Sequence, residues 1–81
     1  MGNYTVRTRL RPDEAVERAL AFFGEGGLGL TVERQEPCCL YLVGGGGHVQ
    51  VTVKEGEKHT EVDLLTREWD YQVKQFMHEI A

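Results

Sequence analysis

Residues 38–54 read CCLYLVGGGGHVQVTVK, and this stretch decides the fold. Four consecutive glycines, which can adopt the positive φ angles of a tight turn, stand between two runs of strand-forming residues. In the second run valines alternate with polar residues, the period-two pattern of a half-buried strand. A two-residue turn at the middle of the glycines sets Leu42 opposite Val49 and Leu40 opposite Val51. The stretch therefore predicts an antiparallel hairpin with one apolar face.

Outward from this hairpin, the same patterns predict three more strands and two helices. Pro12 suits the first position of a helix that runs to Phe23, with Gly24 as a left-handed cap, and a second apolar stripe at helical spacing runs from Trp69 to Ile80. Alternation of apolar and polar side chains marks the remaining strands, which we place at residues 4–10, 28–33 and 60–64.

Loop lengths then predict how the strands pair. A turn at residues 56–57 sets Val51 opposite Val62, and an odd loop at residues 35–37 sets Val32 opposite Leu40. Both registers keep the apolar residues on one face of the sheet.

The first strand is placed by charge. Its polar side carries Arg7 and Arg9, and that of the last strand carries Glu61 and Asp63. Opposite charges across neighbouring strands are mildly favourable, so we predict that these two strands lie side by side and antiparallel.

The resulting prediction is an α+β fold. It is a five-stranded, mostly antiparallel sheet in the order 1-5-4-3-2 with two helices packed on one face. We expect a single βαββββα domain spanning residues 1–81. Its predicted core comprises Val16, Leu20, Phe23, Leu30, Leu40, Val51, Val62, Trp69, Val73 and Phe76.

This order, with a meander of strands after the first helix and a closing helix, resembles one half of the TATA-box-binding-protein fold. The resemblance implies a sheet whose open face binds DNA. Acidic residues offset the basic residues on this face, so we expect no DNA binding here. The basic residues are Arg7, Arg9 and Lys54, and the acidic ones are Glu33, Glu61 and Asp63.

Composition excludes further classes of function. The chain of 81 residues has a net charge of −4, which gives no electrostatic attraction to nucleic acid or to an anionic membrane. No apolar run approaches the ~20 residues of a membrane span. Cys38 and Cys39 point to opposite faces of a strand, where a disulfide between them is geometrically poor. We therefore expect free thiols and a cytoplasmic location.

No motif indicates a cofactor or a metal. A formal G-x-G-x-x-G match at residues 24–29 follows a helix and precedes a strand, the reverse of a dinucleotide site. His48, His59 and His78 lie on separate elements and do not converge as zinc ligands would.

The cysteines carry no catalytic signal either. We place Cys38 toward the core and Cys39 on the open face, beside Glu33 and Thr52, where no base or cation would activate a thiol. We therefore expect no catalytic residue, and enzymatic activity ranks last among the possible functions.

The third strand is apolar on both sides, which usually means that both faces are covered. We predict an interface on the open face, with Tyr41 at its centre, Cys39 and Val43 along the strand, and Thr31 and Gln50 to the sides. The expected function is a protein-interaction domain, either a homodimer or a subunit docking on another protein. The alternative is a small-molecule binding domain, with the ligand between helices and sheet or on this same strip.

Overall fold

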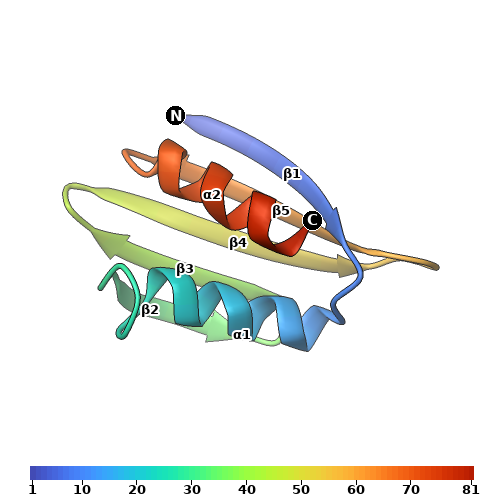
Figure 1. Cartoon of the computed structure of the whole chain (residues 1–81). Coiled ribbons are helices and arrows are strands. Elements are labelled where there is room, and N and C mark those ends of the chain that lie inside the picture. Colours follow the sequence, from blue (N-terminus) through green and yellow to red (C-terminus); the bar gives the residue numbers. More distant parts are fainter.

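The computed structural model describes residues 1–81 as two layers, one of helices and one of strands (Figure 1). All strand pairs are antiparallel, in the order β1-β5-β4-β3-β2, so the predicted α+β architecture is confirmed. Both helices lie on the same face, α1 against β3 and β4 and α2 against β5 and β1. The elements are β1 (Gly2–Thr8), α1 (Pro12–Phe23), β2 (Thr31–Glu36), β3 (Cys39–Gly44), β4 (Gly47–Glu55), β5 (Thr60–Arg67) and α2 (Asp70–Ile80).

The core fills the space between the helices and the sheet. Eight of the ten residues predicted for it are buried there, while Leu20 and Trp69 are half-buried and pack against its margin. The rings of Phe23 and Phe76 lie 5.2 Å apart, centroid to centroid, and join α1 to α2. The Trp69 indole N–H donates to the carbonyl oxygen of Gly44 at 2.9 Å, so the polar atom of the ring is satisfied.

The β3–β4 hairpin forms as predicted. Gly45 and Gly46 have φ angles of 58° and 79°, and this pair of positive values is the two-residue turn that matches the twist of the strands. Leu42 faces Val49, and Leu40 faces Val51. Glycine is required at both turn positions because other residues rarely adopt positive φ.

The predicted β4–β5 register is wrong by two residues. Val51 faces Leu64 rather than Val62, because the connection is a four-residue loop from Gly56 to His59. A shift of two preserves side-chain direction, so the valines still face the core.

The predicted β2–β3 pairing is also wrong, and β2 spans Thr31–Glu36 instead of the predicted residues 28–33. The turn is the dipeptide at residues 37–38, and the register shifts at a bulge between Val32 and Arg34. Val32 consequently faces Leu42 instead of Leu40. One extra residue is needed to keep the apolar side chains on one face. It lies within the strand, at the bulge, and not in the loop.

The first strand begins and ends two residues earlier than predicted. Thr8 is its last core-facing residue, 2% exposed, and its hydroxyl accepts a hydrogen bond from the Leu10 N–H at 3.2 Å. Arg7 faces Glu61 as predicted, but Thr5 is the residue that faces Asp63, and Arg9 lies beyond the strand. The predicted pairing of charges is therefore half right.

Two further features concern the helices. Gly24 caps α1 with φ −86°, not in the predicted left-handed conformation, and the positive φ angles fall on Gly26 and Gly29 instead. Neither α1 nor α2 has the length and apolar character that a bilayer span requires.

Candidate functional site

The face of the sheet opposite the helices carries the predicted interface. Tyr41 lies on β3 between Cys39 and Val43, and Gln50 faces it from β4 as predicted. On the other side its neighbour is Arg34, because the bulge in β2 moves Thr31 up to face Val43. Thr31 thus lies in the patch but not beside Tyr41, and this part of the prediction is wrong.

Exposure separates these residues into two groups. Cys39, Tyr41 and Val43 are half-buried, whereas Thr31 and Gln50 are exposed. The Tyr41 ring stacks on the His48 imidazole, with 5.6 Å between centroids and 27° between planes. Strand neighbours therefore cover much of the apolar row on β3, and the tyrosine is held in one orientation.

Leu65 extends the apolar row and was missed by sequence reasoning. It faces Gln50 across the β4–β5 pair and is half-buried on the open face. The alternation that places Glu61 and Asp63 on this face would have placed Leu65 there too, had the strand been continued past residue 64. We call Cys39, Tyr41, Val43 and Leu65 the open-face patch.

Charged and polar side chains surround the open-face patch. The Asp63 carboxylate accepts a hydrogen bond from the Thr5 hydroxyl at 2.8 Å, and the Lys54 ammonium lies 3.9 Å from its other oxygen. Both charged groups are partly exposed, so this ion pair contributes at most about 1 kcal/mol. The arrangement is an apolar centre with a polar rim.

The two cysteines form a disulfide, contrary to the prediction. The prediction assumed that both lie on a strand, but Cys38 belongs to the turn, where side chains do not alternate across a pleat. Cys38 is consequently exposed rather than directed at the core, and Cys39 has Glu36 as its β2 neighbour in place of Glu33.

Glu36 and the two sulfur atoms form a possible metal-ligand cluster. One ligand atom from each residue lies within 4.8 Å of the others. Cysteine binds a metal as the thiolate, but both sulfur atoms belong to the Cys38–Cys39 disulfide. The disulfide form therefore offers only the Glu36 carboxylate as a metal ligand of ordinary strength.

A polar clamp joins β1 to the start of α2. The Tyr4 hydroxyl donates to the Asp70 carboxylate at 2.6 Å, and the Lys74 ammonium lies 5.5 Å from the centre of the Tyr4 ring. A Cβ at Gly2 would overlap both side chains of this hydrogen bond, so glycine allows the close approach. The hydrogen bond to Asp70, then burial and the charge of the same carboxylate, raises the pKa of Tyr4 above 10.0.

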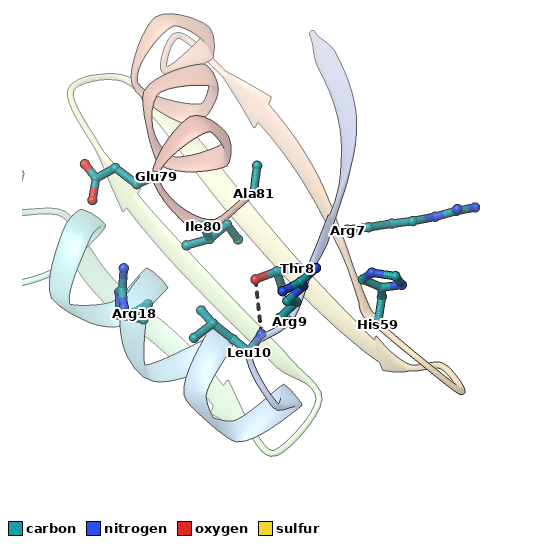
Figure 2. A pocket seen from close by; sticks show the side chains of 9 residues that line it. All are labelled: Arg7, Thr8, Arg9, Leu10, Arg18, His59, Glu79, Ile80 and Ala81. Carbon is teal, nitrogen blue, oxygen red and sulfur yellow. Dashed lines mark hydrogen bonds between the residues drawn. The ribbon is translucent and has the colours of Figure 1, made fainter.

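At one end of the molecule, a hollow of about 540 Å³ opens where β1, α1, the β4–β5 loop and α2 meet (Figure 2). Sequence reasoning missed it, because its lining comes from four segments that only the tertiary structure brings together. We call it the arginine hollow. Its principal lining residues are Arg7, Arg9, Leu10, Arg18, His59 and Ile80.

No protein-family model matches this chain, and no curated protein sequence matches it either.

Proposed function

We propose that the protein is a self-associating domain that forms a homodimer through the open face of its sheet. The observation that carries the proposal is the apolar row on β3. Cys39, Tyr41 and Val43 lie on the face that no helix covers, and Leu65 adds to them from β5. Strands that are apolar on both faces usually have both faces covered, and tyrosine is enriched at interface hot spots.

Charge favours a second copy as the partner. By register, the open face carries four basic residues and three acidic ones, while the whole chain has a net charge of −4. The acidic excess therefore lies elsewhere, and two copies meeting through this face avoid most of their mutual repulsion. Two-fold dimers are also the commonest oligomers. The basic residues of the open face are Arg7, Arg34, Lys54 and Arg67, and the acidic ones are Glu36, Glu61 and Asp63.

The size of the face sets the expected affinity. Five strands spaced ~4.8 Å apart and about 20 Å long present roughly 500 Å² of flat area per copy. A standard interface buries about 800 Å² on each partner, so this one falls near the lower limit for a specific complex. We therefore expect a dissociation constant of about 1–100 μM.

The proposal includes the context in which the dimer acts. The layout is like one half of the TATA-box-binding-protein fold, and we propose that the likeness extends to the use of the open sheet face for binding, with protein in place of DNA. We also propose a cytoplasmic location. In that reducing environment the Cys38–Cys39 disulfide would open to two free thiols, and that of Cys39 belongs to the open-face patch.

Light scattering and sedimentation of purified protein across a concentration series test the proposal. We expect the mass to rise from the 9.2 kDa of one chain to twice that value as concentration passes through the micromolar range. Tyr41→Asp puts a charge in the open-face patch and should keep the protein monomeric. Val43→Lys should do the same, and circular dichroism verifies that each variant is folded.

Tyr71→Asp is the matched control. Tyr71 is 69% exposed on α2, away from the sheet, and its replacement should leave the dimer intact. A wild type that stays monomeric to about 1 mM, far above the expected dissociation constant, would refute the proposal. An unchanged dimer in both patch variants would place the interface elsewhere.

A further inference from the structure

The arginine hollow concentrates positive charge in an acidic protein. Three of the six arginines of the chain line it, together with His59, although the net charge is −4. Arg7, Arg9 and Arg18 are exposed, and none of them takes part in an ion pair. The guanidinium groups of Arg9 and Arg18 are therefore available to an anion in the hollow, whereas Figure 2 shows Arg7 pointing away from Leu10 and Ile80.

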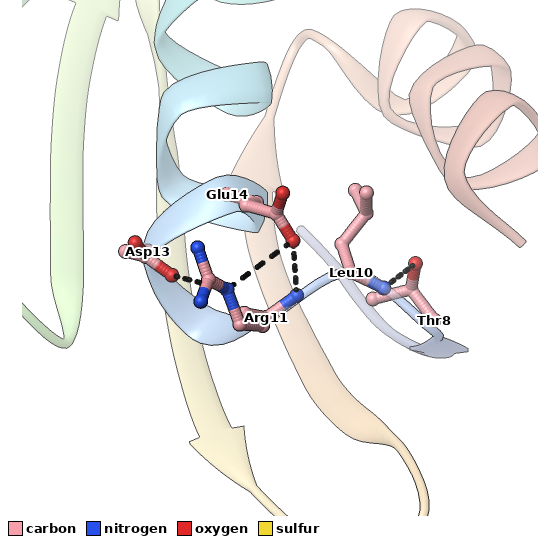
Figure 3. A network of polar contacts seen from close by, with 5 residues as sticks. All are labelled: Thr8, Leu10, Arg11, Asp13 and Glu14. Atoms are coloured by element: carbon pink, nitrogen blue, oxygen red, sulfur yellow. Dashed lines mark hydrogen bonds and ion pairs between the residues drawn. The ribbon is translucent and has the colours of Figure 1, made fainter.

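The neighbouring Arg11 shows the contrast. Its guanidinium lies 3.8 Å from the Asp13 carboxylate and 3.7 Å from that of Glu14, and its backbone N–H donates to Glu14 at 2.9 Å (Figure 3). The acidic residues in the first turn of α1 thus pair with Arg11 at the end of the loop. These two carboxylates therefore do not form ion pairs with the arginines that line the hollow.

One carboxylate side chain lines the hollow. Glu79 comes from the last turn of α2, and Figure 2 shows it pointing away from Thr8 and Arg9. No carboxylate lies within 4 Å of Arg9 or Arg18 as an ion-pair partner. The three arginines of the lining still outnumber its two carboxylates, that of Glu79 and the terminal one at Ala81.

The middle of the hollow is apolar. Leu10 and Ile80 lie between Arg18 on one side and Arg9 on the other (Figure 2). Ile80 is 5% exposed and anchored in the core, so this wall is rigid. A ligand that fills the hollow would contact cationic groups at its sides and hydrocarbon at its centre.

We propose that the arginine hollow binds a small organic phosphate with an apolar substituent. Guanidinium groups bind phosphate oxygens through paired, charge-assisted hydrogen bonds. A phosphate dianion can engage several arginines at once, whereas a carboxylate is satisfied by a single arginine. The apolar substituent would lie against Leu10 and Ile80. The site is distinct from the open-face patch, and Arg7 is the only lining residue that we also count among the charged residues of the open face.

Calorimetric titration with phenyl phosphate tests the proposal. We expect saturable one-to-one binding with a dissociation constant on the order of 1 mM or below, weakening as salt is added. The double variant Arg9→Gln/Arg18→Gln should lose at least about tenfold in affinity. Arg34→Gln is the matched control, because Arg34 is exposed on β2, outside the hollow, and its loss should leave the affinity for phenyl phosphate unchanged.

Two comparison ligands separate the parts of the proposal. Inorganic phosphate should bind more weakly than phenyl phosphate, because it makes no contact with the apolar wall, and benzoate should bind more weakly because it has one fewer oxygen and half the charge. Equal affinity for all three would overturn the assignment of the ligand class. Absence of binding by the wild type, or equal affinity in the double variant and Arg34→Gln, would overturn the site itself.

Discussion

The two faces of the sheet share one backbone but differ in every other respect. On the helix-covered face most residues of the three central strands are fully buried, with Leu40, Val51 and Leu64 at 0% exposure. On the open face their neighbours along the same strands are half-buried or exposed, with an apolar row on β3 and charged residues on the other strands. The covered face therefore supplies most of the apolar burial, and the open face keeps polar and charged side chains accessible to solvent.

The proposed dimer interface thus lies on the face that contributes less to stability. An 81-residue domain has a free energy of unfolding of about 5–15 kcal/mol at most, and nearly all of its apolar burial comes from the covered face. Substitutions on the two faces should therefore have unequal effects.

The largest effect should come from Phe76→Ala. Phe76 is 1% exposed and packs on Phe22 and Phe23, at 5.5 and 5.2 Å between ring centroids. Its truncation should cost about 3–5 kcal/mol of unfolding free energy in a urea titration. Tyr71→Ala on the exposed side of α2 is the control and should cost less than ~0.5 kcal/mol. A loss below ~1 kcal/mol for Phe76→Ala would mean that α2 is not docked on the sheet.

A smaller loss is expected for Trp69→Phe. The phenyl ring retains most of the packing at the margin of the core, but the indole N–H bond to the Gly44 carbonyl is lost. We expect a cost of about 1 kcal/mol in the same titration. No change in stability would show that water replaces this hydrogen bond without penalty.

Tyr4→Phe should change how the stability of the protein depends on pH. The pKa of Tyr4 is raised in the folded state, so its protonated form is favoured there. This contribution to stability is complete below pH about 10 and is lost as pH rises through the raised pKa. The wild type should therefore lose thermal stability faster than Tyr4→Phe at alkaline pH. Parallel melting-temperature curves for the two proteins would contradict the role given to the Asp70 hydrogen bond.

The smallest effect is expected for Gln50→Ala. Gln50 is exposed on β4 beside Tyr41, and its side chain forms no hydrogen bond within the protein. Its truncation should change the unfolding free energy of the monomer by less than ~0.5 kcal/mol. A loss similar to that of Phe76→Ala would erase the difference between the two faces.

Local patterns were sufficient to predict much of the fold. Alternating valines and the glycine turn predicted the β3–β4 hairpin in register, and Pro12 with apolar residues at helical spacing predicted the bounds of α1. The strand order also followed, because the polar faces of β1 and β5 carry opposite charges. These features depend on residues close together in sequence or on a side-chain period that holds along an entire strand.

Three features were decided only by the tertiary structure. The bulge beside Arg34 moved Thr31 away from Tyr41, and the longer β4–β5 loop shifted a register, because the best packing against the helices selects among registers that local sequence leaves equivalent. The turn at residues 37–38 also allows the adjacent Cys38 and Cys39 to form a disulfide that is geometrically poor on a strand.

The arginine hollow depends most strongly on the tertiary structure. Its arginines lie on β1, the loop after it and α1, and its apolar wall includes the end of α2. In the sequence they are scattered charges with no spacing that any motif would detect. The sequence by itself determined which face of each element is buried, because that depends on periodicity. Only the packing of the helices on the sheet determined which of the remaining polar side chains share a site, because their proximity depends on contacts between residues far apart in the chain.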